Sequence, residues 1–107
     1  MKIYIVAPKI LTDQIKAKIN TVQGTLKKDG HTVHSFSDIC KDPDIERDDM
    51  EYLKYEIEAF NKIDYDSVAF LLEAEIEEKC KGEMILAKSL NMIILRLTSD
   101  WKFERIG

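Results

Sequence analysis

Two glutamates at predicted helix positions are the side chains best placed to do chemistry. Glu83 follows Gly82 in the predicted first turn of a helix, where the positive end of the helix dipole would keep its carboxylate ionised. A carboxylate held in this way can attack an anomeric carbon. Glu56 lies on an earlier predicted helix, beside its apolar stripe, so it can face the same cleft. Two carboxylates that flank a glycosidic bond can cleave it, one as nucleophile or base and one as acid.

The sequence lacks glycine-rich phosphate-binding motifs, and its histidines and cysteines do not have the spacing of metal ligands. The loop after the first predicted strand reads APKILT, which is neither a dinucleotide fingerprint nor a P-loop. The two histidines, His31 and His34, lie in a predicted edge strand, where we expect surface histidines rather than metal ligands. The two cysteines, Cys40 and Cys80, are far apart in the chain, which is typical of reduced thiols and not of a zinc site. We therefore expect no cofactor and no metal.

The elements that must position the two glutamates follow from the spacing of apolar residues. Four strands are predicted to alternate with three helices. Since crossovers between parallel strands are right-handed, this order indicates helices on both faces of the sheet. The predicted fold class is a three-layer α/β fold of the flavodoxin or Rossmann kind, with a mostly parallel sheet of four to five strands. The predicted strands are 2–7, 31–36, 67–72 and 92–97, the helices span about 11–26, 50–60 and 82–90, and 37–46 is a predicted loop.

Length and composition limit the other possibilities. A chain of 107 residues allows a single domain spanning residues 1–107, and 45% apolar residues are enough for a core. The net charge is −4, and six of the twelve residues in 38–49 are acidic, so a phosphate backbone would be repelled. The apolar run at 3–7 is too short for a signal sequence or a membrane span. We expect a cytoplasmic protein without nucleic-acid or membrane partners.

Three segments together resemble the nucleoside 2-deoxyribosyltransferase family, which includes 2'-deoxynucleoside 5'-phosphate N-hydrolases. Residues 83–95, EMILAKSLNMIIL, resemble that family's Glu-x-x-x-Ala helix and the strand after it. Residues 2–8, KIYIVAP, are similar to its first strand, in which a tyrosine reaches the substrate pocket. Residues 56–64, EIEAFNKID, resemble its helix with an acidic residue. The similarity extends over about residues 2–97.

The resemblance implies cleavage or transfer of the N-glycosidic bond of a deoxynucleoside or nucleotide. Glu83 would attack C1' of the sugar or stabilise the positive charge that grows there. Glu56, or Glu58 in another register, would orient the sugar or help to protonate the leaving base, and Tyr4 would position the nucleophile. The substrate would further contact Pro8, Lys9, as a phosphate contact, and Asp64. Members of the family are homodimers or larger, and the tail around Trp101, as a short strand or a dimer arm, would complete a neighbour's pocket.

Two other functions stay open. The family usually has glycines shortly before the glutamate and two residues after it, whereas here Gly82 directly precedes Glu83 and Ile85 follows it. A non-catalytic nucleotide-binding sensor or regulatory protein on the same fold would accommodate this difference. The second alternative is a protein-interaction module in which the acidic residues of 38–49 dock a basic partner.

Overall fold

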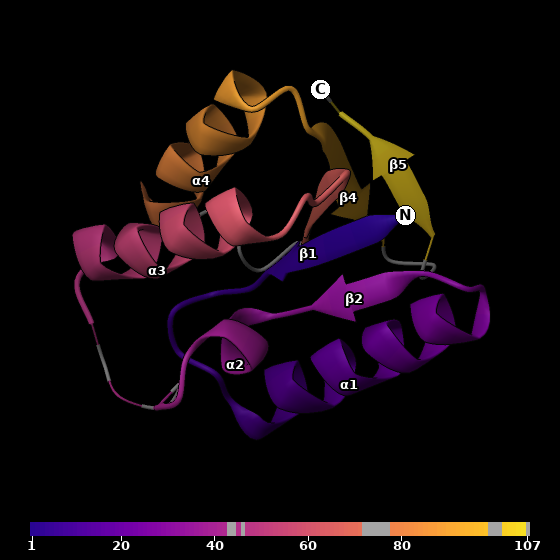
Figure 1. Cartoon of the computed structure of the whole chain (residues 1–107). Coiled ribbons are helices and arrows are strands. Elements are labelled where there is room, and N and C mark those ends of the chain that lie inside the picture. The colour runs from indigo at the N-terminus through magenta and orange to yellow at the C-terminus, as the bar shows by residue number, and fades with distance from the viewer. Residues whose placement is uncertain (43–44, 46, 72–77, 99–101, 107) are drawn as a thin grey trace.

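The chain forms one five-stranded sheet with helices on both faces (Figure 1). The structure is a computed structural model that describes residues 1–42, 45, 47–71, 78–98 and 102–106. Its elements are β1 (Lys2–Val6), α1 (Asp13–Lys28), β2 (Thr32–His34), α2 (Phe36–Ile39), α3 (Asp49–Lys62), β3 (Ser67–Phe70), α4 (Glu78–Ser89), β4 (Ile93–Leu97) and β5 (Phe103–Arg105).

The strand order is β2-β1-β3-β4-β5, in which the first four strands are parallel and β5 is antiparallel to β4. This confirms the predicted α/β fold of the Rossmann or flavodoxin kind. The chain leaves β1 for β2 on one side and then crosses back to β3 on the other. The carboxyl ends of β1 and β3 therefore form the switch point at which open sheets of this kind bind ligands.

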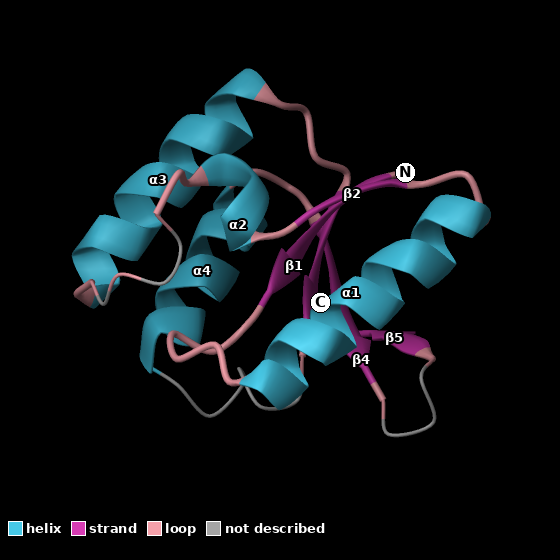
Figure 2. Ribbon diagram, turned by 90° about the horizontal axis from the view of Figure 1, so that it is seen from below, coloured by secondary structure: helices cyan, strands magenta, loops and turns pink. Residues whose placement is uncertain are grey.

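The two faces of β1 enter two different cores. Ile3 and Ile5 pack with α1, whereas Tyr4 and Val6 pack with residues of α3 and α4. Figure 2 shows α1 on one side of the strands and α3 and α4 on the other. Because successive side chains of a strand point to opposite faces, Tyr4 is directed at the two helices that bear the predicted glutamates.

Local signals set the ends of α1 and α3. Thr12 caps α1, because its hydroxyl accepts from the backbone N–H of Ile15 at 3.2 Å. Asp48 and Glu51 form a capping box at the start of α3, in which the Asp48 carboxylate accepts from the Glu51 N–H at 2.9 Å. This capping box fixes the start of α3, the helix that carries Glu56.

Two predicted boundaries are wrong. The second strand ends at His34, and α2 lies in what was expected to be the end of that strand and the following loop. The cause of the helix α2 is local, since the Asp38 carboxylate accepts from the Ser35 N–H at 2.8 Å and closes a helical turn. The last helix has already begun at Glu78, before the predicted start at Gly82. Gly82 is tolerated inside α4 because it faces Leu53, whose Cδ1 would lie 3.1 Å from an added Cβ.

The remaining expectations concern the ends of the fold. Residues 103–105 form β5, which agrees with a short strand in the tail, while Trp101 lies outside the described residues. Within the described parts of the chain, none of the helices combines the length and apolarity that crossing a bilayer needs.

Candidate functional site

Four ionisable side chains meet in the layer between the sheet and the helices α3 and α4. Tyr4 comes from β1, Glu56 from α3, and Lys79 and Glu83 from α4, and none of them is more than 5% exposed. Glu56 is buried because it lies on the inward face of α3, one helical turn from Tyr52 on one side and from Ala59 and Phe60 on the other. The structure therefore brings together the three predicted catalytic residues and adds a lysine. We call these four residues the buried cluster.

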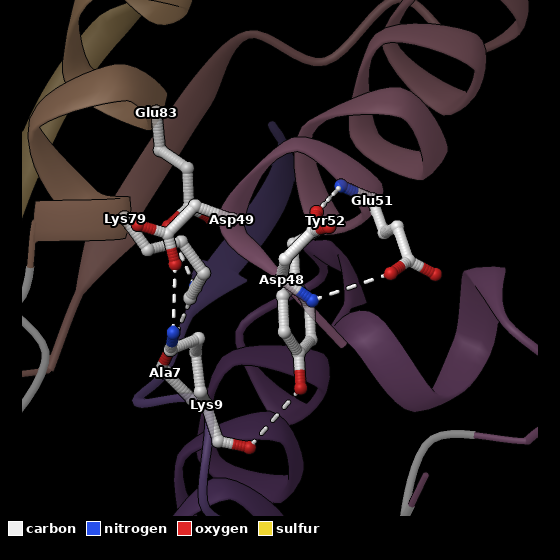
Figure 3. Close-up of polar contacts among 8 residues, drawn as sticks. All are labelled: Ala7, Lys9, Asp48, Asp49, Glu51, Tyr52, Lys79 and Glu83. Atoms are coloured by element: carbon white, nitrogen blue, oxygen red, sulfur yellow. Dashed lines mark hydrogen bonds and ion pairs between the residues drawn. The ribbon is translucent and has the colours of Figure 1, made fainter. Parts of the chain in front are cut away.

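The lysine of the buried cluster neutralises Glu83. Lys79 Nζ donates to Glu83 Oε1 at 2.6 Å and to the carbonyl oxygen of Ala7 at 3.0 Å (Figure 3). The ammonium also lies 5.3 Å from the centre of the Tyr52 ring. Lys79 and Glu83 are four residues apart, so they lie one above the other on the same face of α4.

The carboxyls of Glu56 and Glu83 lie next to each other in the buried cluster. They lie within hydrogen-bonding reach of each other, and the Tyr4 hydroxyl donates to Glu56. Burial, and then the hydrogen bond with Glu83 and its negative charge, raise the pKa of Glu56 well above the ordinary 4.5. Oε1 of Glu56 and Oε2 of Glu83 are buried and accept no hydrogen bond from a donor among the described residues. A proton held by Glu56 and shared with Glu83 satisfies both carboxyls and leaves one negative charge, which Lys79 balances.

Tyr4 stays a hydroxyl and acts as a donor in the buried cluster. Burial, together with the charges of Glu56 and Glu83, raises the pKa of Tyr4 well above its ordinary value of 10.0. Its ring is fixed edge-on against Phe60 and Tyr65, with ring centres 5.1 and 5.7 Å apart. The aromatic contacts thus aim the hydroxyl at Glu56.

The buried cluster borders a narrow hollow at the carboxyl ends of β1 and β2. About 20 Å³ of it is free, which is space for about one water molecule. A wider polar hollow with about 320 Å³ of free space adjoins it and shares Leu11, Ile19, Ser35 and Ser37 with it. The narrow hollow is lined by Tyr4, Ala7, Pro8, Lys9, Leu11, Ile19, Ser35, Phe36, Ser37, Tyr52, Lys79 and Glu83. A molecule larger than water therefore reaches Glu83 only if side chains that line the narrow hollow move.

The predicted binding residues divide into two groups. Pro8 and Lys9 line the narrow hollow, and Lys9 Nζ forms an ion pair with Asp49 at 2.8 Å. Asp64 is exposed in the connection between α3 and β3. It therefore lies at the amino ends of the strands, whereas the hollow lies at their carboxyl ends. Glu58 is also exposed and pairs with Lys62 at 2.8 Å, which lowers the pKa of Glu58. Glu56 is therefore the acid of α3 that reaches the buried cluster.

The expected source of charge stabilisation at Glu83 is wrong. Because α4 has begun by Glu78, Glu83 lies in the second turn of the helix rather than at its N-terminus, where the dipole acts. The ammonium of Lys79 takes that role. Sequence reasoning missed Lys79, although its i,i+4 spacing from Glu83 would have revealed the pair once the helix was extended by one turn.

The histidines and the acidic segment have partners within the fold. The N-terminal amine lies 3.0 Å from His31 Nδ1, and His34 Nδ1 lies 2.7 Å from the Tyr65 hydroxyl. Nowhere in the described ranges do three metal-ligating side chains gather. Of the acids in 38–49, Asp38 accepts from Ser35 and Gln23, Asp48 caps α3, and Asp49 pairs with Lys9.

Comparison with known proteins adds no relative. A scan against protein-family models finds no match, and a search of curated proteins finds no significant similarity. The resemblance to the nucleoside deoxyribosyltransferases therefore stays a hypothesis that is based on residues of this chain.

Proposed function

We propose that this protein cleaves or transfers the N-glycosidic bond of a deoxynucleoside or its 5'-phosphate. One observation carries the proposal: Tyr4, Glu56 and Glu83, which are far apart in the sequence, converge in one buried cluster that borders the ligand-binding edge of the sheet. Burying several ionisable groups is costly, and perturbed groups that border a cleft are typical of functional sites.

A difference in protonation between Glu56 and Glu83 suits two catalytic roles. The raised pKa of Glu56 favours its protonated form, and the ammonium of Lys79 lies 2.6 Å from the carboxyl of Glu83. Paired carboxyls with such different protonation are the usual acid and nucleophile of glycosidic chemistry. Tyr4 donates to Glu56, so in this protein the tyrosine orients the acid rather than the nucleophile.

The proposed reaction has two steps. A carboxylate oxygen of Glu83 bonds to C1', the bond between C1' and the base nitrogen breaks, and the base takes the proton of Glu56 as it leaves. Water or a second base then attacks C1' and releases Glu83, while Glu56 recovers a proton from the attacking group. With water the products are the free base and the sugar or its 5-phosphate, and with a second base the product is a new nucleoside or nucleotide.

Substrate binding must separate the carboxyls. Glu56 and Glu83 are in direct hydrogen-bonding reach, whereas retaining glycosidases hold their carboxyls about 5 to 5.5 Å apart with the sugar between them. The free space beside Glu83 is also smaller than a sugar ring. The proposal therefore includes a step in which side chains that line the hollow, such as Tyr52, move and the sugar enters.

Chromatographic detection of released base tests this function. The protein is incubated with the four deoxynucleosides and their 5'-monophosphates, first alone and then with a second free base as acceptor. Glu83→Gln should lose about 10⁴-fold or more of the activity, as is usual when a nucleophile is removed. Glu78→Gln, an exposed position on the same helix, is the matched control and should retain it. Absence of turnover with every substrate, or full activity of Glu83→Gln, refutes the proposal.

A second candidate function is nucleotide binding without catalysis. Direct contact between the carboxyls and the small free space beside them are what a relative without turnover would show. A ligand that binds only the folded state raises the melting temperature. Stabilisation by a nucleotide without release of base identifies this second function.

A further inference from the structure

We propose that Lys79 is a positioning residue that fixes the negative charge on Glu83 and thereby leaves the shared proton on Glu56. The inference deepens the proposed function and rests on it, because it assigns the acid and the nucleophile. It concerns a residue for which the resemblance implies no role.

The contacts of Lys79 are asymmetric. Its ammonium lies 2.6 Å from Glu83 Oε1, and it donates a second hydrogen bond to the Ala7 carbonyl at 3.0 Å rather than to Glu56. Lys79 and Glu83 are 5% and 2% exposed, so water screens their attraction little. The negative charge of the carboxyl pair is therefore most stable on Glu83, the partner nearest the ammonium.

The groups around the carboxyl pair agree with this assignment. From β1 the Tyr4 hydroxyl donates to Glu56, and from α3 the Tyr52 ring faces the ammonium. On α4 the neighbouring Cys80 is a buried thiol. At the rim of the hollow, Lys9 is paired with Asp49. Burial and the neighbouring charge of Glu83 raise the pKa of Glu56 more than the more distant attraction of Lys79 lowers it.

Removing the ammonium should change the protonation of the pair. A buried carboxylate without a counter-charge is unfavourable, so the pair takes up a second proton more readily. With both carboxyls neutral, Glu83 no longer carries the charge with which it attacks C1'. Lys79 thus acts through Glu83, whose charge it fixes.

Carbon NMR of the glutamate carboxyls, followed across pH, tests the assignment without any substrate. In Lys79→Met the second proton should enter the carboxyl pair about 1 to 3 pH units higher than in the wild-type protein, the usual effect of a nearby opposite charge. Lys79→Arg should restore the wild-type titration. Lys81→Met removes an exposed lysine of the same helix, which pairs with Glu78 at 2.9 Å, and should leave the titration of the pair unchanged.

The results separate the proposals. If Lys79→Met titrates like the wild-type protein, Lys79 does not fix the charge and the inference is overturned. If Lys79→Met does not fold, Lys79→Gln, which can still donate to the Ala7 carbonyl but has no charge, should show the same upward shift. Where base release is observed, the acid limb of kcat should move by the same amount in Lys79→Met, which a purely structural role would not cause. If the wild-type protein releases no base, the proposed function fails while the NMR titration still decides the role of Lys79.

Discussion

Replacing Glu56 by glutamine should make the protein more stable above about pH 5, by an amount that grows with pH. In the folded protein Glu56 is 1% exposed, and burial beside Glu83 raises its pKa well above 4.5, which favours a protonated carboxyl. A glutamine has the same shape, donates to Glu83 through its amide N–H, and accepts from the Tyr4 hydroxyl through its amide oxygen. The variant thus keeps the hydrogen bonds but needs no proton to do so.

The size of this stabilisation follows from the one proton that Glu56 takes up when the wild-type protein folds. Above its ordinary pKa of 4.5 an unfolded Glu56 is ionised, whereas burial raises the pKa of Glu56 in the folded state, so that folding takes up a proton. The free energy of unfolding of the wild-type protein then falls, relative to the variant, by about 1.4 kcal/mol for each pH unit. The fall continues until the pH reaches the pKa of Glu56 in the folded protein, above which the difference becomes constant. Two pH units within this window therefore correspond to about 2.7 kcal/mol.

Urea unfolding followed by circular dichroism at several pH values measures this difference. Glu58→Gln is the matched control, since Glu58 lies on the same helix but is exposed beside Lys62, and its pKa is lowered rather than raised. That control should show no growing stabilisation as the pH rises above 5, about half a unit above the ordinary pKa of a glutamate. A difference between wild type and Glu56→Gln that stays constant across the window would mean that Glu56 is ionised in the folded protein. The reasoning on the shared proton, and on Glu56 as the acid, would then be refuted.

Two further substitutions test the packing around the site by urea unfolding. Tyr4→Phe removes the hydroxyl that donates to Glu56 and should cost about 1 to 3 kcal/mol, since a buried acceptor loses its partner; an unchanged free energy of unfolding would show that this hydrogen bond contributes nothing. Gly24→Ala should stabilise α1 by about 1 kcal/mol, because nothing lies within 4 Å of the added Cβ. Gly82→Ala should raise the free energy of unfolding by less, because its Cβ would lie 3.1 Å from Leu53 Cδ1. Equal stabilisation by the two substitutions would mean that Leu53 moves aside at no cost.

The order of strands and helices was predictable from the sequence. Apolar residues at helical spacing predicted α1 and α3, and continuous apolar runs predicted the buried strands, because burial of one stripe or of both faces leaves a local pattern. The alternation of strands and helices then predicted a mostly parallel sheet, since right-handed crossovers allow few other arrangements. The boundaries of α2 and α4 were missed. A single capping contact creates α2, and the packing of Gly82 on Leu53 allows α4 to continue through a glycine.

Part of the candidate site was also predictable. Tyr4, Glu56 and Glu83 were selected by residue type and by resemblance, and the fold places them in contact. Asp64 was selected in the same way but lies at the amino ends of the strands, away from the hollow, because α3 leads the chain from one end of the strands to the other.

Only the tertiary structure decided how the site is charged. The sequence contains 20 acidic residues, and nothing local distinguishes a carboxyl that is ionised in water from one that holds a proton. Glu56 differs from the exposed Glu58, two residues away, because folding buries it against Glu83, Lys79 and Tyr4, which come from other elements. Protonation depends on desolvation and on charges a few ångströms away, and these are properties of the assembled fold.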